Sequence, residues 1–357
     1  MTDETPEGFA RHGLSTIEPL VGDLGGGITP VERFFVCTTT ETQHVDRDGW
    51  TLTVDGDAAG AARTFTITDL TELDTHVVPA WLECAGNGRQ LFEIVDGHPS
   101  GGGDGFDTQW MLGAMGQAVW SGVRLRDVLD LVGVDPSATV VGTHGPDPDG
   151  ETLEGVDDHV AMNLPIDKAL DPDTIIATHM NGEPLPAEHG APARLVVPGW
   201  IGTYWVKWLE RLEVSSHPVR TWRGEEYYVH RTPDGVKGEP VTAHPVKSTL
   251  ALPWEAELAE GPRTFRGYAR SGSAEITKVE VAVDDGPWFA VAMTPTYGRW
   301  AWSLFEFQAD LEPGDHVIRT RAHDATGAMQ PDSQPYHPNT ILWHTVTPHP
   351  IRILPGG

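Results

Sequence analysis

The pattern of hydrophobic and polar residues changes character near residue 244. After that point, short runs with strand periodicity follow one another closely, and turn sequences rich in Asp, Gly and Pro separate them. In the run Ile276–Val283, the side chains of Val279 and Val281 fall on one face and those of Lys278 and Glu280 on the other. This alternation is typical of antiparallel strands that are buried on one face only.

The predicted strands of this second part number about seven, as in a β-sandwich. The change of pattern predicts two domains, residues 1–243 and 244–357, with a boundary near His244–Ser248. In the second domain we expect strands at Thr264–Arg270, Ile276–Val283, Trp288–Met293, Trp300–Phe307, His316–Ala322 and Ile341–Thr347.

The first part mixes strand and helix patterns, which predicts an α+β fold class for the chain as a whole. A helix is expected to begin near Thr68, and a second one to cover Arg124–Val132, where leucines and valines gather on one side. The Gly-rich segment 97–105 and the acidic, Pro/Gly-rich segment 142–158 are expected to be loops. Strands are expected at Arg33–Thr40, Trp50–Val54, Val77–Leu82, Leu195–Val197 and Lys207–Val214.

Length and composition limit the class of protein. A chain of 357 residues is long enough for two hydrophobic cores. No apolar run approaches the ~20 residues that a membrane-spanning helix needs. The segment Met1–Pro6 is acidic and polar, and it has neither the basic and apolar regions of a secretion signal nor a twin arginine. The simplest expectation is a cytoplasmic protein, although loss of a leader would give the same sequence.

The formal net charge of −28 argues against nucleic acid as a partner, because phosphates would be repelled. The acidic residues are spread along the chain, and only 5 of its 24 basic residues are lysines. Repulsion within such a surface is screened in molar salt, where the Debye length falls to about 3 Å. We interpret the charge as an adaptation to high salt, as in halophiles. A cationic partner is the alternative.

The chain contains two cysteines, Cys37 and Cys84, too few for a disulfide scaffold. There is no Cys-x-x-Cys motif for zinc or iron–sulfur and no Cys-x-x-Cys-His motif for haem, so no haem is expected. Cys84 follows the apolar run that ends at Leu82, and a turn with two glycines leads from it to Arg89. A thiolate is a soft metal ligand and a nucleophile, and a nearby cation favours it. The alternative is a buried structural cysteine.

A second group of candidate residues consists of His189, Arg194 and Lys207. They flank Gly-containing turns at the ends of apolar runs. Cations and free backbone N–H groups in such turns suit an anionic ligand that carries a phosphate. Each residue also has a structural interpretation, since Arg194 could pair with a surface acid, Lys207 could end a strand and His189 could cap a loop. The place of Lys207 between Trp205 and Trp208 favours the functional one.

Taken together, these motifs resemble the sulfite oxidase family of molybdenum enzymes. The second domain is similar to the immunoglobulin-like dimerisation domain of that family through Trp300-Ala301-Trp302 and the stretch from Arg321 to Pro331. The likeness covers roughly residues 30–350. In the first domain it rests on Cys84-Ala85-Gly86-Asn87-Gly88-Arg89, His189-Gly190-x-Pro192-x-Arg194, Val197-Pro198-Gly199 and Val206-Lys207-Trp208-Leu209, in this order.

The resemblance implies a role for each site residue. Cys84 would be the thiolate ligand of molybdenum, and the molybdopterin cofactor would supply two further sulfur ligands; tungsten has similar chemistry and is not excluded. Tyr227 would lie beside the metal, and Arg89 would belong to the substrate pocket. The pterin and its phosphate would be held by His189, Arg194 and Lys207, by the main chain of Trp205 and Val206, by the loop with Phe35, Cys37 and Thr38, and by Asp147.

The resemblance also implies an activity. Such an enzyme would transfer an oxygen atom and oxidise sulfite or a related small substrate, a small oxyanion or oxo-compound. It would pass electrons to a separate carrier and would form a homodimer through its second domain.

Two positions depart from the family pattern. Cys37 and Thr340 stand where the family's sulfite oxidisers carry arginines, which leaves Arg89. A reductase of sulfoxide-like or other oxo-compounds on the same fold therefore stays open, as does a metal-free binding or structural protein. Cys37 is either a small apolar filler or a second thiol near the metal.

Overall fold

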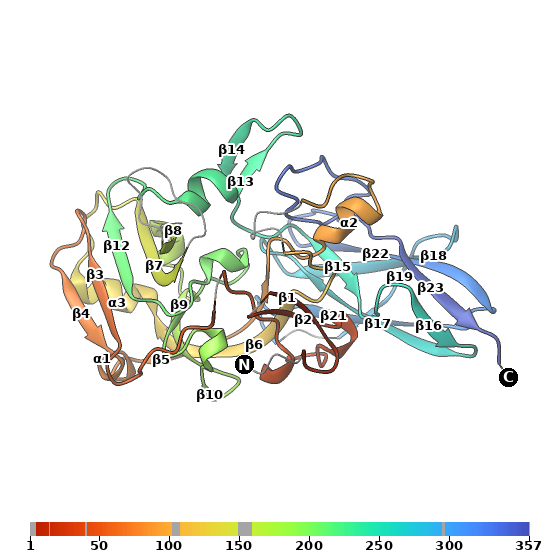
Figure 1. The fold of residues 1–357 in the computed structure, drawn as a ribbon, viewed down its shortest axis with the longest axis horizontal. Helices are drawn as coiled ribbons and strands as arrows, with labels where there is room; N and C mark the ends of the chain where they lie inside the picture. The colour runs from red at the N-terminus through yellow and green to blue at the C-terminus, as the bar shows by residue number, and fades with distance from the viewer. Residues whose placement is uncertain are drawn as a thin grey trace.

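The computed structural model describes residues 5–13, 15–39, 41–101, 108–148, 159–294 and 297–356. Figure 1 shows two bodies side by side, one formed mainly by the first 240 residues and one by the rest. Strands dominate both bodies, and helices are few and short. Residues 149–158 of the acidic loop expected at 142–158, part of the Gly-rich loop expected at 97–105 and residues 1–4 lie outside the described residues. Residues 142–148 were predicted as loop but belong to the strand Val140–Pro148. In the described part, no helix is long and apolar enough to cross a membrane.

The first body contains two five-stranded sheets. All pairings in them are antiparallel except that of β3 with β12, which is parallel. One sheet has the order β10-β9-β6-β5, with β11 paired to β9: β5 (Thr75–Glu83), β6 (Met115–Arg124), β9 (Ile175–Met180), β10 (Glu183–Pro184) and β11 (Arg194–Val196). The other has the order β4-β3-β12-β7-β8: β3 (Thr51–Asp55), β4 (Arg63–Thr66), β7 (Val140–Pro148), β8 (His159–Pro165) and β12 (Arg211–Ser215).

The helices of the first 240 residues are short, and Figure 1 shows that one of them, α2, lies beside the second body. Helix α1 begins after Thr66, whose hydroxyl accepts from the backbone N–H of Asp69 while the Asp69 carboxylate accepts from that of Thr66, a reciprocal cap. Helix α3 buries Leu125, Val128 and Leu129, as predicted, but Leu131, which was expected on the same apolar side, is 45% exposed, and Val132 is buried instead. The helices are α1 (Ile67–Thr71), α2 (Arg89–Ile94), α3 (Leu125–Val132) and α4 (Ile166–Ala169), with single turns η1 (Val21–Asp23), η2 (Val31–Arg33), η3 (Ala187–His189), η4 (Gly202–Tyr204) and the π-type η5 (Arg223–Tyr227).

The second body consists of two sheets that enclose one core. Their buried faces contribute Phe265 and Phe305 from one sheet and Val281 and Ile318 from the other. The first sheet has the order β15-β17-β21-β20: β15 (Lys247–Leu250), β17 (Arg263–Arg270), β20 (Ala292–Thr294) and β21 (Ser303–Ala309). The second has the order β16-β23-β22-β18-β19: β16 (Ala256–Ala259), β18 (Ile276–Val283), β19 (Phe289–Ala290), β22 (Gly314–Asp324) and β23 (His349–Leu354).

A shared apolar cluster joins the two bodies. It packs Trp81 and Phe92 of the first against Tyr268, Trp302 and Trp343 of the second. Two small hairpins, β1 (Phe9–Gly13) with β2 (Thr16–Pro19) and β13 (Val229–Arg231) with β14 (Lys237–Pro240), complete the fold.

Several strand predictions were wrong in whole or in part. Trp300–Phe307 is a strand only from Ser303, and Trp288–Met293 is interrupted at Val291. Lys207–Val214 is a strand only from Arg211, because Trp208 has a positive φ of 51° that breaks the extended backbone. Within Arg33–Thr40, Val36 alone makes an isolated pairing, with Ile17, among the described residues. Ile341–Thr347 is irregular, since Thr340 and Leu342 have φ values of 45° and 60°, and the last strand lies further on, in β23.

Candidate functional site

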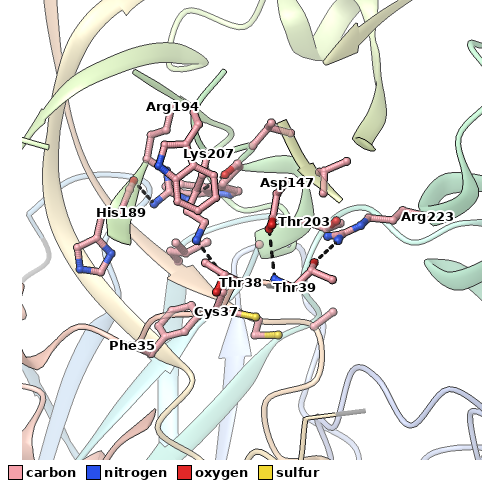
Figure 2. Close-up of a pocket in the computed structure, with 18 of the residues that line it drawn as sticks. Phe35, Cys37, Thr38, Thr39, Asp147, His189, Arg194, Thr203, Lys207 and Arg223 are labelled. Carbon is pink, nitrogen blue, oxygen red and sulfur yellow. Dashed lines mark hydrogen bonds between the residues drawn. The ribbon is translucent and has the colours of Figure 1, made fainter. Parts of the chain in front are cut away.

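A cavity opens in the first body between the loop after β5 and the loops that flank β11. It holds about 800 Å³ of space free of protein atoms, part of it open to solvent. Figure 2 shows side chains from distant parts of the chain converging on it. The predicted site residues that line it are Phe35, Cys37, Thr38, Cys84, Asp147, His189, Arg194, Trp205, Val206 and Lys207.

Cys84 is held by the backbone at the end of β5. Its N–H donates to the carbonyl of Ala114 at 3.0 Å, and its own carbonyl accepts from the N–H of Asn87 at 3.0 Å. The following turn requires its glycines: Gly88 has a φ of +90°, and a Cβ on Gly86 would lie 3.0 Å from the Arg89 guanidinium. The sequence around Cys84 therefore builds a tight turn that presents a thiol to the cavity.

Cys37 lies against Cys84. The neighbouring Cys84 thiol lowers the pKa of Cys37 to about 7, with help from the charges of Lys207 and Arg223. The nearness of Cys37, together with burial, raises the pKa of Cys84 well above its ordinary value. Cys37 is exposed to the cavity although protein surrounds it.

Arg194 forms the back wall of the cavity. It is 3% exposed, and it lies over the ring of Trp120, with 5.1 Å between its guanidinium carbon and the ring centre. Its Nη1 donates to the carbonyl of His189 at 3.1 Å and its Nη2 to that of Trp205 at 2.9 Å. Within the described structure its Nε has no hydrogen-bond partner. Burial lowers the pKa of this side chain.

Lys207 and His189 complete this wall. The Nζ of Lys207 donates to the carbonyls of Cys37 at 2.9 Å and Glu188 at 3.4 Å and lies 4.2 Å from the ring centre of Trp208. Burial lowers the pKa of Lys207 to about 7. Burial and the neighbouring charges of Arg194 and Lys207 lower that of His189 to about 3, so this imidazole is neutral.

On the other side of the cavity, Asp147 and Arg223 meet at Thr39. The Asp147 carboxylate accepts from the Thr39 N–H at 3.2 Å, and the Arg223 Nη2 donates to the Thr39 hydroxyl at 2.8 Å. Figure 2 shows these two charged side chains on either side of Thr39. Strand β7 presents Asp147, and the turn η5 presents Arg223.

The structure places Arg89 and Tyr227 together but behind the cavity. The Nη2 of Arg89 donates to the Tyr227 hydroxyl at 3.0 Å, and its Nε donates to the carbonyl of Thr340 at 3.2 Å. In the described structure neither side chain lines the cavity, whereas Tyr228 does, and its ring lies 4.8 Å from that of Tyr227. Arg89 and Tyr227 thus form a layer behind the cavity wall.

Arg223, Tyr228 and Thr203 also line the cavity, and none of them was predicted from the sequence. Arg223 and Tyr228 flank Tyr227 within six residues, so the segment that contains one candidate could have suggested the others. Thr203 carries no comparable signal. Its buried hydroxyl has no hydrogen-bond partner within the described structure.

The lining suits an anionic, sulfur-bearing cofactor. Two buried polar atoms without partners within the described structure, the Arg194 Nε and the Thr203 hydroxyl, come from residues of the wall and could each donate to an anionic ligand. Among the described residues no three His, Cys, Asp or Glu side chains are grouped to hold a metal ion. A metal bound by the Cys84 thiolate would therefore need ligands from the cofactor, which a pterin with two sulfurs supplies.

Comparison with protein families gives the same class of molecule. Residues 39–223 match the oxidoreductase molybdopterin binding domain, and residues 239–347 match the Mo-co oxidoreductase dimerisation domain. The chain therefore belongs to the sulfite oxidase-like family of molybdopterin oxidoreductases.

Individual relatives of the chain support the same family. Sulfite oxidase of Gallus gallus is 33% identical over 330 residues, which cover 86% of this chain and 68% of that protein. Mitochondrial sulfite oxidase of Drosophila melanogaster is 31% identical, and the match spans 57% of its length. The NADH nitrate reductase of Ulva prolifera is 32% identical, over 35% of its length.

A solved structure confirms the fold. The sulfane dehydrogenase SoxCD from Paracoccus pantotrophus superposes with a TM-score of 0.81 at 26% identity, over 96% of this chain and 86% of that one. The coarse prediction of a molybdenum-binding domain followed by a dimerisation domain is therefore confirmed.

Proposed function

We propose that this protein is a molybdenum-dependent oxidoreductase that oxidises sulfite or a related small sulfur substrate by oxygen-atom transfer. One observation carries the proposal. The Cys84 thiol faces a cavity whose opposite wall contains the buried guanidinium of Arg194 and the ammonium of Lys207. A soft metal ligand and a site for a phosphate thus lie in one cavity of the right chemistry for molybdopterin.

In this proposal the chain's own residues hold the cofactor. Arg194 and Lys207 donate to its phosphate, and the neutral imidazole of His189 packs beside Phe34, with 5.4 Å between ring centres. Asp147 and the loop of Phe35, Cys37 and Thr38 contact the pterin, and Cys84 gives up its proton to bind the metal. When bound, the cofactor supplies a redox metal that exchanges an oxygen atom and two electrons with a substrate. Molybdenum is the expected metal, and tungsten would use the same ligands.

The reaction also determines which charges the substrate pocket needs. Sulfite takes up one oxygen atom from water and releases two electrons and two protons as it becomes sulfate, and the electrons leave to a separate carrier. Both sulfite and sulfate are anions, so a substrate pocket needs cations. Arg223 supplies one at the cavity, and the Arg89–Tyr227 layer lies directly behind.

Reduction of a neutral oxo-compound, such as a sulfoxide, is a second candidate because the cations are fewer than in the family pattern. Cys37 places a thiol at one expected arginine position. At the other, Thr340 is fully buried, and its hydroxyl donates to the carbonyl of Ser100 at 3.1 Å. A neutral substrate would need fewer cations than sulfite does.

The second domain supports a proposal about assembly. Two sheets around one core, together with the dimerisation-domain match, support an immunoglobulin-like sandwich that joins two copies of the chain. We place the domain boundary at residues 243 and 244, between β14 and β15. A location in the cytoplasm and an origin in a high-salt organism remain predictions from the sequence.

The experiment that tests the proposal begins with elemental and pterin analysis of the purified protein. We expect about one molybdenum and one molybdopterin per chain, given one site and one thiolate ligand. Sulfite should then bleach the visible spectrum of the oxidised centre, and a dye should accept the electrons. Assays in both directions, with sulfite and an oxidising dye or with a sulfoxide and a reducing dye, separate the two candidates. Absence of molybdenum and tungsten would leave the metal-free binding protein.

A further inference from the structure

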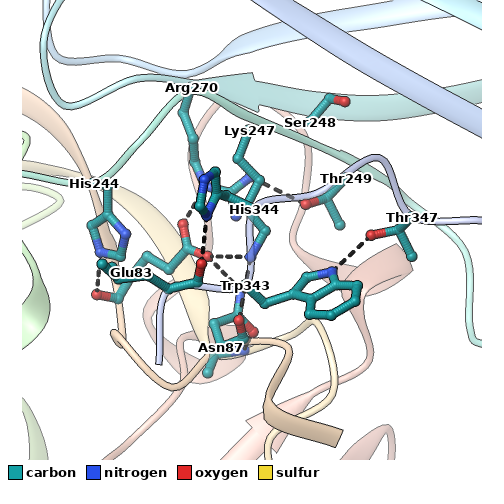
Figure 3. A network of polar contacts seen from close by, with 12 residues as sticks. Glu83, Asn87, His244, Lys247, Ser248, Thr249, Arg270, Trp343, His344 and Thr347 are labelled. Carbon is teal, nitrogen blue, oxygen red and sulfur yellow. Dashed lines mark hydrogen bonds and ion pairs between the residues drawn. The ribbon is translucent and has the colours of Figure 1, made fainter. Parts of the chain in front are cut away.

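Directly behind the Cys84 turn lies a buried charged network that connects the two domains (Figure 3). Its centre is Glu83, the last residue of β5, which is 1% exposed. The Lys247 Nζ donates to its Oε1 at 2.9 Å, and the Arg270 Nε donates to its Oε2. Both cations belong to the second domain, and they are 4% and 1% exposed. Burial raises the pKa of Glu83, but the charges of Arg270 and Lys247 outweigh it and hold this pKa well below its usual range.

Within the described part of their own domain, no carboxylate pairs with Lys247 or Arg270. Lys247 and Arg270 are direct partners in the antiparallel pairing of β15 with β17, so their side chains leave the same face of the sheet. Two like charges in this position destabilise a sheet, and burial increases the cost. The carboxylate that compensates them comes from the first domain. The charges of Lys247 and Arg270 are therefore balanced only when β5 packs against the second domain.

The network reaches Cys84 through Asn87. The Asn87 side chain donates to Glu83 Oε1 at 2.8 Å and accepts from the N–H of Ala114 at 3.1 Å. The carbonyl of Ala114 in turn accepts from the N–H of Cys84. Lys247 also donates to the backbone carbonyl of Asn87 at 3.3 Å. Glu83, Asn87 and Ala114 thus surround the cysteine backbone, and a side chain of the second domain contacts this ring directly.

A third contact fixes the strand end itself. His244, 5% exposed, lies 3.0 Å from the Glu83 carbonyl through its Nε2. Burial lowers the pKa of His244 to about 4, so the ring is neutral and can donate from this nitrogen. Both the side chain and the carbonyl of the residue before Cys84 are therefore held by the second domain.

We propose that Glu83, held by Lys247 and Arg270, is a positioning residue that lets the second domain set the geometry of the Cys84 thiolate at the metal. This inference rests on the proposed function of Cys84 as the metal ligand. Partners that orient a ligand from behind commonly affect metal affinity and the properties of the metal. The second domain would then act on the centre as well as on assembly.

The test uses the full-length holoenzyme and two variants. Glu83→Gln keeps the shape of the side chain but leaves two buried cations without their carboxylate. Lys247→Met leaves the Glu83–Arg270 pair intact and removes the contact with Asn87. Because it leaves no buried cation without a carboxylate, it is expected to fold even if Glu83→Gln does not. The matched control is Asp173→Ala, which removes another contact between the domains, the 2.8 Å hydrogen bond from Trp300 to Asp173, away from the cysteine turn.

The readouts are the molybdenum content per chain and the visible charge-transfer absorption between the thiolate sulfur and the metal. A merely structural role of the network would change neither of them. We expect that the network variants that fold either bind the metal roughly tenfold or more weakly, as measured by the metal retained after dialysis, or shift this absorption. Loss of the outer partners of metal ligands has effects of this size. Asp173→Ala should show the wild-type absorption even where its unfolding temperature is lower. A wild-type absorption and metal content in every network variant that folds would overturn the inference. A wild-type protein without molybdenum or tungsten would instead overturn the proposed function.

Discussion

Cys84 lies against Cys37, a residue 47 positions earlier in the chain, at the wall of one cavity. The neighbouring thiol and burial raise the pKa of Cys84 well above its ordinary value, which favours its protonated form. Binding of a metal must therefore displace this proton, and the surroundings of Cys37 change at the same moment.

Replacement of the two cysteines should have different results. Cys84→Ser is expected to abolish molybdenum binding, because a hydroxyl is a poor ligand for a soft site. Cys37→Ser should retain the metal and shift the visible absorption, since a neighbour of the ligand sulfur changes. Elemental analysis and absorption spectra of both purified variants check this. An unchanged spectrum and rate in Cys37→Ser would identify Cys37 as a filler of the loop.

Arg194 should be needed for both stability and the cofactor. Arg194→Met removes donors to two backbone carbonyls and leaves those acceptors buried, which should lower the free energy of unfolding by about 1–3 kcal/mol. Cofactor content should fall as well. The control is Arg211→Met: its side chain is 39% exposed and pairs with Asp55, so its loss should cost about 0–1 kcal/mol. Denaturant titration and pterin analysis of both variants decide the matter, and equal losses would contradict the prediction.

Lys207 gives a pH dependence to anion binding. Burial lowers its pKa to about 7, so in the cofactor-free chain the ammonium is present below that pH and lost above it. A bound phosphate favours the ammonium and raises the pKa. Binding of sulfate, a phosphate analogue that does not itself titrate between pH 6 and pH 8, should therefore take up little proton at pH 6 and up to one proton at pH 8.

Calorimetry in buffers of different ionisation enthalpy measures this proton uptake. Lys207→Met should abolish the difference between the two pH values. A variant that still takes up the proton would show that another group, such as Cys37, is responsible.

Arg223 should distinguish an anionic substrate from a neutral one. Arg223→Met is expected to raise the KM for sulfite about tenfold or more, because a hydrogen bond between charged groups contributes roughly 1.5–3 kcal/mol. The KM for a neutral sulfoxide should change little. Arg220→Met is the matched control, since Arg220 lies three residues earlier and its side chain is 59% exposed. Equal effects on both substrates would place Arg223 at the cofactor instead.

Much of the fold could be predicted because its strands obey a simple alternation. Ile276–Val283 has the predicted bounds, and α3 lies within one residue of the predicted helix. Two of the failures, at Lys207–Val214 and Ile341–Thr347, share a physical cause: Trp208, Thr340 and Leu342 have positive φ values, which residues of these types rarely adopt and no periodicity signals. In such segments tertiary contacts, rather than local preference, fix the backbone.

The candidate site could be predicted where short motifs carry several functional residues at once. The segment from His189 to Lys207 contributes most of one wall. By contrast, the Glu83 network joins residues up to 187 positions apart, and each of them looks ordinary in the sequence. Only the packing of the two domains shows that Lys247 and Arg270 face one carboxylate.

The net charge of −28 predicts that this protein is more stable in concentrated salt. Most surface pairs, such as Arg266 with Glu306, are exposed and contribute little, so repulsion among the excess carboxylates dominates at low salt. Molar potassium chloride shortens the Debye length to about 3 Å and screens this repulsion. The unfolding midpoint should therefore rise steadily from about 0.1 M to molar potassium chloride, measured by circular dichroism at constant pH. The buried Glu83–Arg270 pair is shielded from the salt and should not reverse this trend. A midpoint that falls with added salt would contradict the interpretation and favour a cationic partner as the reason for the charge.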